Sequence, residues 1–194
     1  TKTPTATTAS GCPTGASAVA SYSYVVTHPN GGSFTALDIT GRLTQGDTVR
    51  VNFSINSACS SVRVSLVSYT APAPYFDRNT AYLQQVFDYQ SSIFGTGSKT
   101  MLVKVPGCNY QVDFVVGSVI FQLGPASSNN FYGDQQRMID YDNGGDNACG
   151  PAPTEVATLP ATATKTNTPT KTNTPPPPTA TKTATPTRTN TAYS

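Results

Sequence analysis

The stretch Val49-Arg50-Val51-Asn52-Phe53-Ser54-Ile55 alternates apolar and polar side chains without a break. Successive side chains of a β-strand point to opposite faces, so this alternation predicts a strand with one buried face and one face in water. The stretch Val62-Arg63-Val64-Ser65-Leu66 repeats the pattern a few residues later. The two stretches together predict an antiparallel sheet.

Outward from these two stretches, short runs of the same kind are separated by Gly, Pro, Asn and Ser, and no helical periodicity of useful length interrupts them. The expected strands are residues 18–27, 34–43, 47–56, 61–70, 82–90, 97–106 and 110–121. Seven strands at this spacing predict an all-β fold, an immunoglobulin-like antiparallel β-sandwich. The loop-rich residues 122–150 are expected to form a long excursion over the sandwich.

The domain is flanked by extended Thr/Pro-rich N- and C-terminal arms. We expect an N-terminal arm over residues 1–14, the sandwich over residues 15–150 and an extended C-terminal tail over residues 151–194. The tail repeats Lys-Thr-Asn-Thr-Pro from Lys165 and again from Lys171, and it has too few apolar residues to build a core. The repeat fits either an edge strand or a polyproline II helix, and the sequence does not decide between them.

Cys12, Cys59, Cys108 and Cys149 form an even set with no C-x-x-C spacing, which argues against zinc and for two disulfides. Disulfides indicate an oxidising, extracellular or cell-surface location. Three pairings are possible in principle. We expect Cys12 to pair with Cys149, because both stand where the domain meets an arm, and Cys59 with Cys108, because each precedes a strand-like run.

The charge balance excludes some classes of partner. The chain carries 12 Lys and Arg against 10 Asp and Glu, a formal net charge of +2. This near-balance argues against a nucleic-acid binder, which needs a clustered basic face. No apolar stretch is long enough for a membrane span.

Chemistry-bearing motifs are scarce. His28, the single histidine, precedes Pro-Asn-Gly-Gly and is expected to lie in a hairpin turn, and no hydrolase or nucleotide motif occurs. The sequence therefore predicts a protein that is not an enzyme, with no catalytic residues and no cofactor. Calcium is the one metal for which the sequence offers suitable ligands. Asp140, Asp142 and Asp146 stand beside a glycine turn, and they fit either a solvated loop or a calcium site.

Two further sets of residues are candidates for recognition and modification. Several aromatic residues fit either a sugar-stacking platform or packing in the core and between subunits, and Trp is absent: Tyr69, Tyr75, Phe76, Tyr82, Tyr89, Phe131 and Tyr132. Thr beside Pro in an exported tail is the usual acceptor of O-linked glycans: Thr164, Thr166, Thr168, Thr170, Thr172, Thr174, Thr181, Thr183, Thr185 and Thr187. Asn52-Phe53-Ser54 is the one N-glycosylation sequon, and Asn52 is expected on the outward face of its strand.

Residues 67–72, 85–88, 108–115 and the segment from Leu123 to Tyr132 resemble a module of exported bacterial cell-surface proteins. The resemblance covers roughly residues 35–145. It implies a β-rich, non-enzymatic unit beside low-complexity linkers and a location at the cell surface. The Thr/Pro arms resemble the mucin-like stalks of secreted bacterial proteins.

The length of the tail predicts assembly. Extended at about 3.1 Å per residue, residues 151–194 reach on the order of 130 Å, whereas the domain is about 40 Å across. We therefore expect a structural subunit of an extracellular filament or surface layer, a homopolymer whose tail docks on neighbouring subunits at their exposed strand edges. The alternative is a carbohydrate-binding or adhesive module carried on Thr/Pro linkers of a larger secreted protein.

Overall fold

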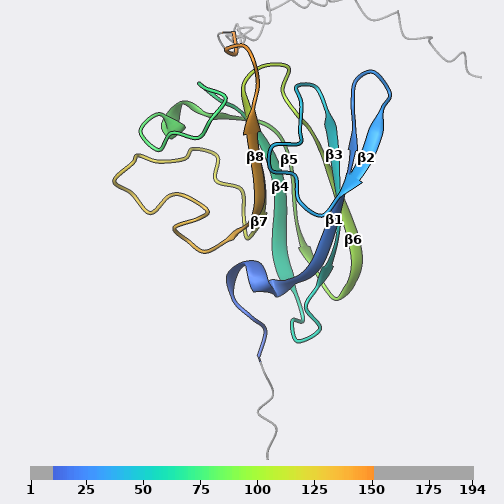
Figure 1. The fold of residues 1–194 in the computed structure, drawn as a ribbon. Coiled ribbons are helices and arrows are strands. Elements are labelled where there is room, and N and C mark those ends of the chain that lie inside the picture. Colours follow the sequence, from blue (N-terminus) through green and yellow to red (C-terminus); the bar gives the residue numbers. More distant parts are fainter. Residues whose placement is uncertain (1–10, 151–194) are drawn as a thin grey trace, which may run out of the picture. The chain divides into compact units, whose positions relative to one another are not determined.

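The computed structural model describes residues 11–150, which form two four-stranded antiparallel sheets (Figure 1). The strand order is β2-β1-β3-β6 in the first sheet, sheet A, and β5-β4-β7-β8 in the second, sheet B. The strands are β1 (Val19–Thr27), β2 (Ser33–Ala36), β3 (Thr48–Ile55), β4 (Val62–Thr70), β5 (Gln85–Phe94), β6 (Gly97–Lys104), β7 (Tyr110–Val116) and β8 (Met138–Gly144). The described residues contain two short 3₁₀ helices, η1 (Gly15–Ala18) and η2 (Ala81–Leu83). Within residues 11–150, no helix is long and apolar enough to cross a membrane. The predicted all-β sandwich is confirmed.

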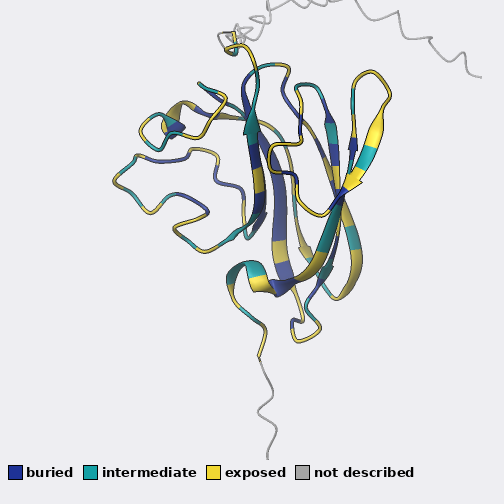
Figure 2. Cartoon of the chain, viewed as in Figure 1, coloured by how far each residue is buried: buried dark blue, intermediate teal, exposed yellow. Residues whose placement is uncertain are grey.

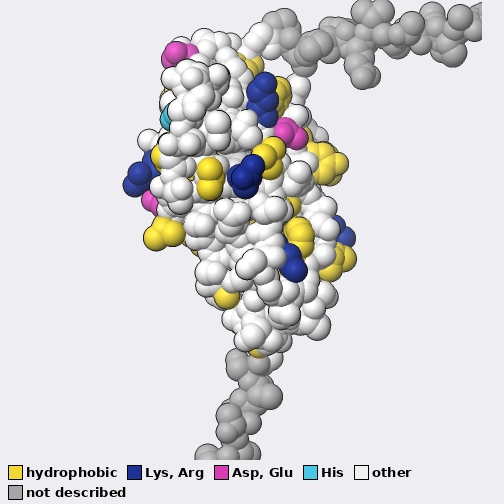
Figure 3. Space-filling model, turned by 90° about the vertical axis from the view of Figure 1, so that its right-hand side faces the viewer, with side chains coloured by type: hydrophobic (Ala, Val, Ile, Leu, Met, Phe, Trp, Pro, Cys, Tyr) yellow, Lys and Arg dark blue, Asp and Glu magenta, His cyan; other side chains and the backbone are white. Residues whose placement is uncertain are grey.

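The alternating stretch that predicted the sheet forms β3. Its side chains Val49, Val51, Phe53 and Ile55 point between the sheets and are at most 4% exposed. The ring of Phe53 lies 5.5 Å from that of Phe114 on β7, so the two sheets meet through aromatic contacts. Asn52 is exposed on the opposite face, as predicted for the sequon. That face belongs to the side of the molecule shown in Figure 3, where neutral polar surface surrounds scattered hydrophobic and basic side chains.

The strands differ clearly from expectation in four places. The strand expected over residues 82–90 begins at Gln85 and ends at Phe94. The strand expected over residues 34–43 ends at Ala36, and the one expected over 110–121 ends at Val116. Gly117 explains the end at Val116, because its φ of +91° turns the chain out of the sheet. An eighth strand, β8, occupies part of the segment expected as loop.

Strands β4 and β7 are buried on both faces (Figure 2). Their inward side chains belong to the core between the sheets, and their outward ones form a second core beneath residues 117–137. Tyr69 of β4 donates a hydrogen bond to the Ile120 carbonyl at 2.7 Å, and its hydroxyl lies 2.8 Å from that of Tyr132. The predicted excursion over the sandwich is therefore confirmed for residues 122–137, which together with residues 117–121 form the cover of sheet B.

The disulfide pairing predicted from the sequence is wrong. The bonds join Cys12 to Cys59 and Cys108 to Cys149. Residues 11–14 and residues 145–150 lie at opposite ends of the sandwich, so Cys12 and Cys149 are far from each other (Figure 1).

The strand pairing explains the observed bonds. The start of β1 pairs with the end of β3, where Val19 faces Ile55, and this brings Cys12 to Cys59. The unexpected strand β8 runs antiparallel to β7 and ends opposite its first residue, Tyr110, so the chain returns to Cys108. The position of Cys149 beside Cys108 therefore depends on β8, a strand that the sequence pattern does not predict.

Non-reducing peptide mapping should recover Cys12–Cys59 and Cys108–Cys149. The Cys108–Cys149 bond closes a separation of 41 residues, so the double variant C108S/C149S should lose about 4 kcal/mol of unfolding free energy, measured by urea denaturation. A cross-linked peptide that contains Cys12 and Cys149 is the result that contradicts this assignment.

Candidate binding pocket

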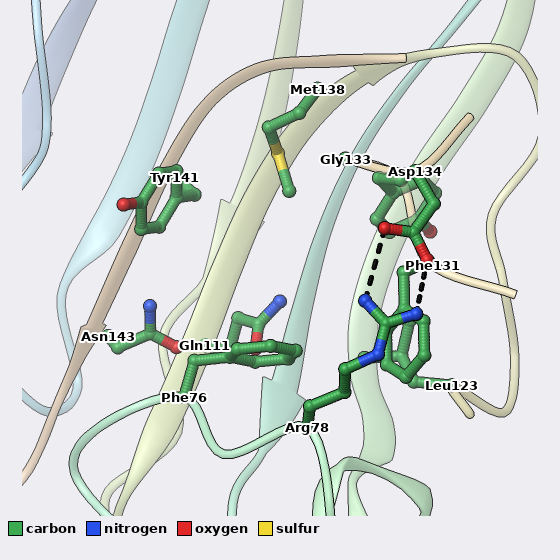
Figure 4. Close-up of a pocket in the computed structure, with 11 residues that line it drawn as sticks. Phe76, Arg78, Gln111, Leu123, Phe131, Gly133, Asp134, Met138, Tyr141 and Asn143 are labelled. Atoms are coloured by element: carbon green, nitrogen blue, oxygen red, sulfur yellow. Dashed lines mark hydrogen bonds and ion pairs between the residues drawn. The ribbon is translucent and has the colours of Figure 1, made fainter. Parts of the chain in front are cut away.

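A pocket of about 250 Å³ opens on the outer side of sheet B (Figure 4). Three parts of the chain line it: the loop after β4, the cover of sheet B, and the strands β7 and β8 themselves. The side chains on which its chemistry depends are Phe76 and Arg78 from the loop, Phe131 and Asp134 from the cover, and Gln111 and Tyr141 from the strands. Segments far apart in the sequence thus converge on one site.

Arg78 holds the loop and the cover together. Its Nε donates to the Ala126 carbonyl at 2.8 Å and its Nη2 to the Ser128 carbonyl at 3.0 Å. The guanidinium also forms a two-pronged ion pair with Asp134, which lowers the pKa of that carboxyl. Because four interactions converge on one side chain, this wall of the pocket is fixed in place.

The aromatic wall is fixed by the same residue. The Arg78 guanidinium carbon lies 4.1 Å from the centre of the Phe131 ring, which is itself edge-on to Phe76 with centroids 6.0 Å apart. Phe131 is buried, whereas Phe76 is 42% exposed. In Figure 4, Tyr141, 46% exposed, and Asn143 lie on the other side of the pocket from the Arg78–Asp134 pair. Two accessible rings therefore frame the opening.

The base of the pocket is polar. Gln84 Nε2 donates to Gln111 Oε1 at 2.9 Å, and Gln111 Nε2 donates to Asp113 Oδ2 at 2.7 Å. Asp113 is fully buried, and its Oδ1 has no hydrogen-bond partner in the described part of the chain. Burial raises the pKa of Asp113 to about 7, and the bond from Gln111 offsets only part of that rise. The pocket therefore combines aromatic faces with amide and carboxyl groups, a set suited to binding.

The structure brings together only part of the aromatic set that the sequence singled out. Phe76, Phe131 and Tyr132 line the pocket, and Tyr69 lies beneath it, bonded to Tyr132. The three others are exposed elsewhere: Tyr75, Tyr82 and Tyr89, at 67%, 49% and 45%. Sequence reasoning missed Arg78, Gln111, Asp134 and Tyr141, because polar residues of a loop and a strand carry no pattern that signals convergence.

The solvated-loop interpretation of Asp140 and Asp142 is wrong, and the geometry gives no calcium site. Both side chains point inward from β8 and accept backbone N–H groups: Ile39 donates to Asp140 at 3.2 Å, and Leu43 donates to Asp142 at 2.9 Å. Burial raises the pKa of both carboxyls, an effect that these amides partly offset. Asp146 is exposed after the strand, and no group of three His, Cys, Asp or Glu side chains within residues 11–150 is placed to hold a metal ion.

His28 lies in the β1–β2 hairpin turn, as predicted, where its backbone N–H donates to the Gly32 carbonyl at 2.7 Å. Its Nδ1 is 2.8 Å from Asp47 Oδ1. The O-glycosylation candidates from Thr164 to Thr187, the C-terminal tail and residues 1–10 of the N-terminal arm lie outside the described residues.

No protein-family model, curated protein or solved structure matches the chain.

The stability of the domain should fall as pH rises from about 4 to about 7. Asp113 keeps its proton in the folded state up to a pKa of about 7, whereas the unfolded chain releases it near 3.8. The resulting penalty to the unfolding free energy is absent below the lower pKa, complete above the higher one, and on the order of 4 kcal/mol. Replacing Asp113 with Asn should remove that part of the slope.

Urea denaturation across this pH range measures the effect on wild type and D113N. The exposed Asp146→Asn is the matched control and should keep the wild-type slope. Equal pH slopes for wild type and D113N refute the role of Asp113.

Proposed function

We propose that the chain is a non-enzymatic structural subunit of an extracellular filament or surface layer, in which the tail of one copy docks on the domain of another. The observation that carries the proposal is the fixed aromatic pocket on a domain whose flanking arms have the opposite charge. Residues 11–150 carry seven Lys and Arg against nine Asp, a net charge of −2. The remaining residues carry five Lys and Arg against one Glu, a net charge of +4. Attraction between unlike charges favours contact between an arm and a domain.

Two disulfides support an extracellular location, because such bonds persist in oxidising compartments. Sandwiches of the immunoglobulin-like type commonly serve as cell-surface domains, and we place this sandwich in that broad class. Head-to-tail contacts between identical copies do not close on themselves unless a rotation makes a ring, so they produce fibres or sheets.

A specific observation also favours a carbohydrate-binding or adhesive module. The exposed rings of Phe76 and Tyr141 frame a pocket that contains the amides of Gln111 and Asn143. Sugar rings stack on aromatic faces and form hydrogen bonds with amides. In this case the Thr/Pro arms serve as linkers and the ligand is a glycan instead of another copy.

Truncation after Pro153 tests the first proposal. The shortened chain keeps both cores and both disulfides, so it should remain folded and monomeric, while the full chain assembles. Sedimentation velocity and negative-stain microscopy measure this difference. Assembly of the truncated chain contradicts a role for the tail, and a monomeric full chain that binds polysaccharide supports the adhesive module.

We also propose O-linked glycans on the tail threonines between Thr164 and Thr187. The intact mass of the native protein should then exceed the 20.3 kDa of the polypeptide. Mass spectrometry before and after chemical removal of O-glycans gives the comparison. A native mass equal to that of the bare chain excludes the modification.

A further inference from the structure

We infer that the pocket over sheet B is the receptor for residues Pro175–Pro178 of another copy, bound as a polyproline II helix. This inference rests on the proposed function and names the contact through which copies join. It also chooses between the two conformations that the sequence left open for the tail. Three observations carry it: the occupied strand edges, the aromatic pocket, and the length and charge of the tail.

The edges of the described sandwich are largely occupied by its own groups. On β6, the Leu102 N–H donates to Gln90 Oε1 at 3.0 Å and the Lys104 N–H donates to Asp88 Oδ2 at 2.8 Å. Two β6 edge amides that a docking strand would need are thus already satisfied by β5 side chains.

The far edge of sheet B is covered in a similar way. Thr40 Oγ1 donates to the Tyr141 carbonyl of β8 at 3.0 Å, and the carboxylates of β8 hold residues 37–43 against it. Of the two other edge strands, β2 is only four residues long, and β5 directs its Asp88 and Gln90 side chains toward β6. Three of the four edges are thus short or engaged by groups of the same domain, which favours a mode of docking that needs no edge amides.

Polyproline II recognition is such a mode. Proline has no N–H group, and aromatic-lined grooves bind proline rings through their faces. Phe76 and Tyr141 offer accessible rings, and Phe76 packs edge-on against Phe131, on which Arg78 lies. A pre-formed wall loses little side-chain freedom when a ligand binds, which favours affinity.

The polar groups of the pocket complement the same ligand. A polyproline II helix has no internal hydrogen bonds and leaves its carbonyls open to donors. Gln111 and Asn143 are cross-strand partners on β7 and β8 and both line the pocket. Because the Gln111 amide is already bonded to Gln84 and Asp113, the Asn143 amide is the donor offered to the ligand. An amide donor beside aromatic rings matches a ligand that alternates carbonyls and apolar rings.

The tail supplies the matching segment. Pro175–Pro178 is the one run of adjacent prolines in the chain, and Lys171 and Lys182 flank it. These cations suit a domain of net charge −2. From residue 151 to Pro175, an extended chain covers about 75 Å, more than the roughly 40 Å width of the domain, so the segment reaches a neighbouring copy.

Complementary variants of the full chain test the inference. Phe76→Ala removes the pocket ring but leaves a working tail, and replacement of Pro175–Pro178 by four alanines leaves a working pocket. Neither variant alone should assemble. A one-to-one mixture should form a dimer and stop, because each pair has one working pocket and one working tail, and sedimentation velocity resolves these species.

Tyr89→Ala is the matched control, since Tyr89 is a similarly exposed aromatic residue outside the pocket, and it should assemble as wild type does. A peptide of residues 170–184 should bind the four-alanine chain and lose at least about tenfold in affinity when Phe76→Ala is added. Circular dichroism and disulfide mapping confirm that each variant is folded.

The outcomes separate the inference from the proposed function. If Phe76→Ala assembles normally while truncation after Pro153 abolishes assembly, the tail joins copies elsewhere and the pocket inference is wrong. If the truncated chain assembles, the proposed function itself fails. If the peptide does not bind and Phe76→Ala instead abolishes binding to a polysaccharide, the pocket is a glycan site. If the wild type is monomeric and binds the peptide only after its own tail is removed, the tail docks within one chain, and docking between copies is wrong.

Discussion

Strands β4 and β7 carry apolar side chains on both faces, and the burial of their outward side chains shapes the rest of the domain. Val67, Tyr69 and Val115 point away from the sandwich interior and need a cover of their own. Each such side chain gains about 2 kcal/mol on full burial, which favours the folding of residues 117–137 back over sheet B. The direction in which the chain leaves that cover determines where β8 pairs with β7. The position of β8 in turn brings Cys149 to Cys108.

The carboxylates of β8 in turn determine the conformation of residues 37–43. Asp140 and Asp142 take up backbone N–H groups of residues 37–43, and so convert a segment with strand-like sequence into a loop that closes the side of the sandwich. Buried carboxylates are tolerable only because amides satisfy them. Asp113 is the exception, since one of its oxygens has no partner in the described residues and the pKa of the carboxyl is raised to about 7. The domain thus keeps one buried acid directly beneath its pocket.

The pocket is a consequence of the cover. Residues 117–137 and the loop after β4 meet above sheet B, and Arg78 joins them through two carbonyls and the carboxylate of Asp134. Because the same guanidinium also packs on Phe131, the aromatic wall is rigid before any ligand arrives. Rigid aromatic walls suit both proline-rich chains and sugar rings. Three features favour a proline-rich chain as the ligand of the pocket: the Thr/Pro arms of this protein, the charge that they carry, and the sheet edges that are already occupied.

The sequence by itself determined the fold class and most of the strands, because alternation along residues such as Val49 to Ile55 is a local property of the chain. It also placed the His28 turn and the cover of sheet B. Only the tertiary structure decided the rest. From the sequence, Asp140 and Asp142 fit a solvated loop or an ion site. In the structure they accept hydrogen bonds from the amides of Ile39 and Leu43, which lie 101 and 99 residues away along the chain. The disulfide pairing and the pocket likewise depend on which segments meet in space, and no periodicity in the chain records such long-range contacts.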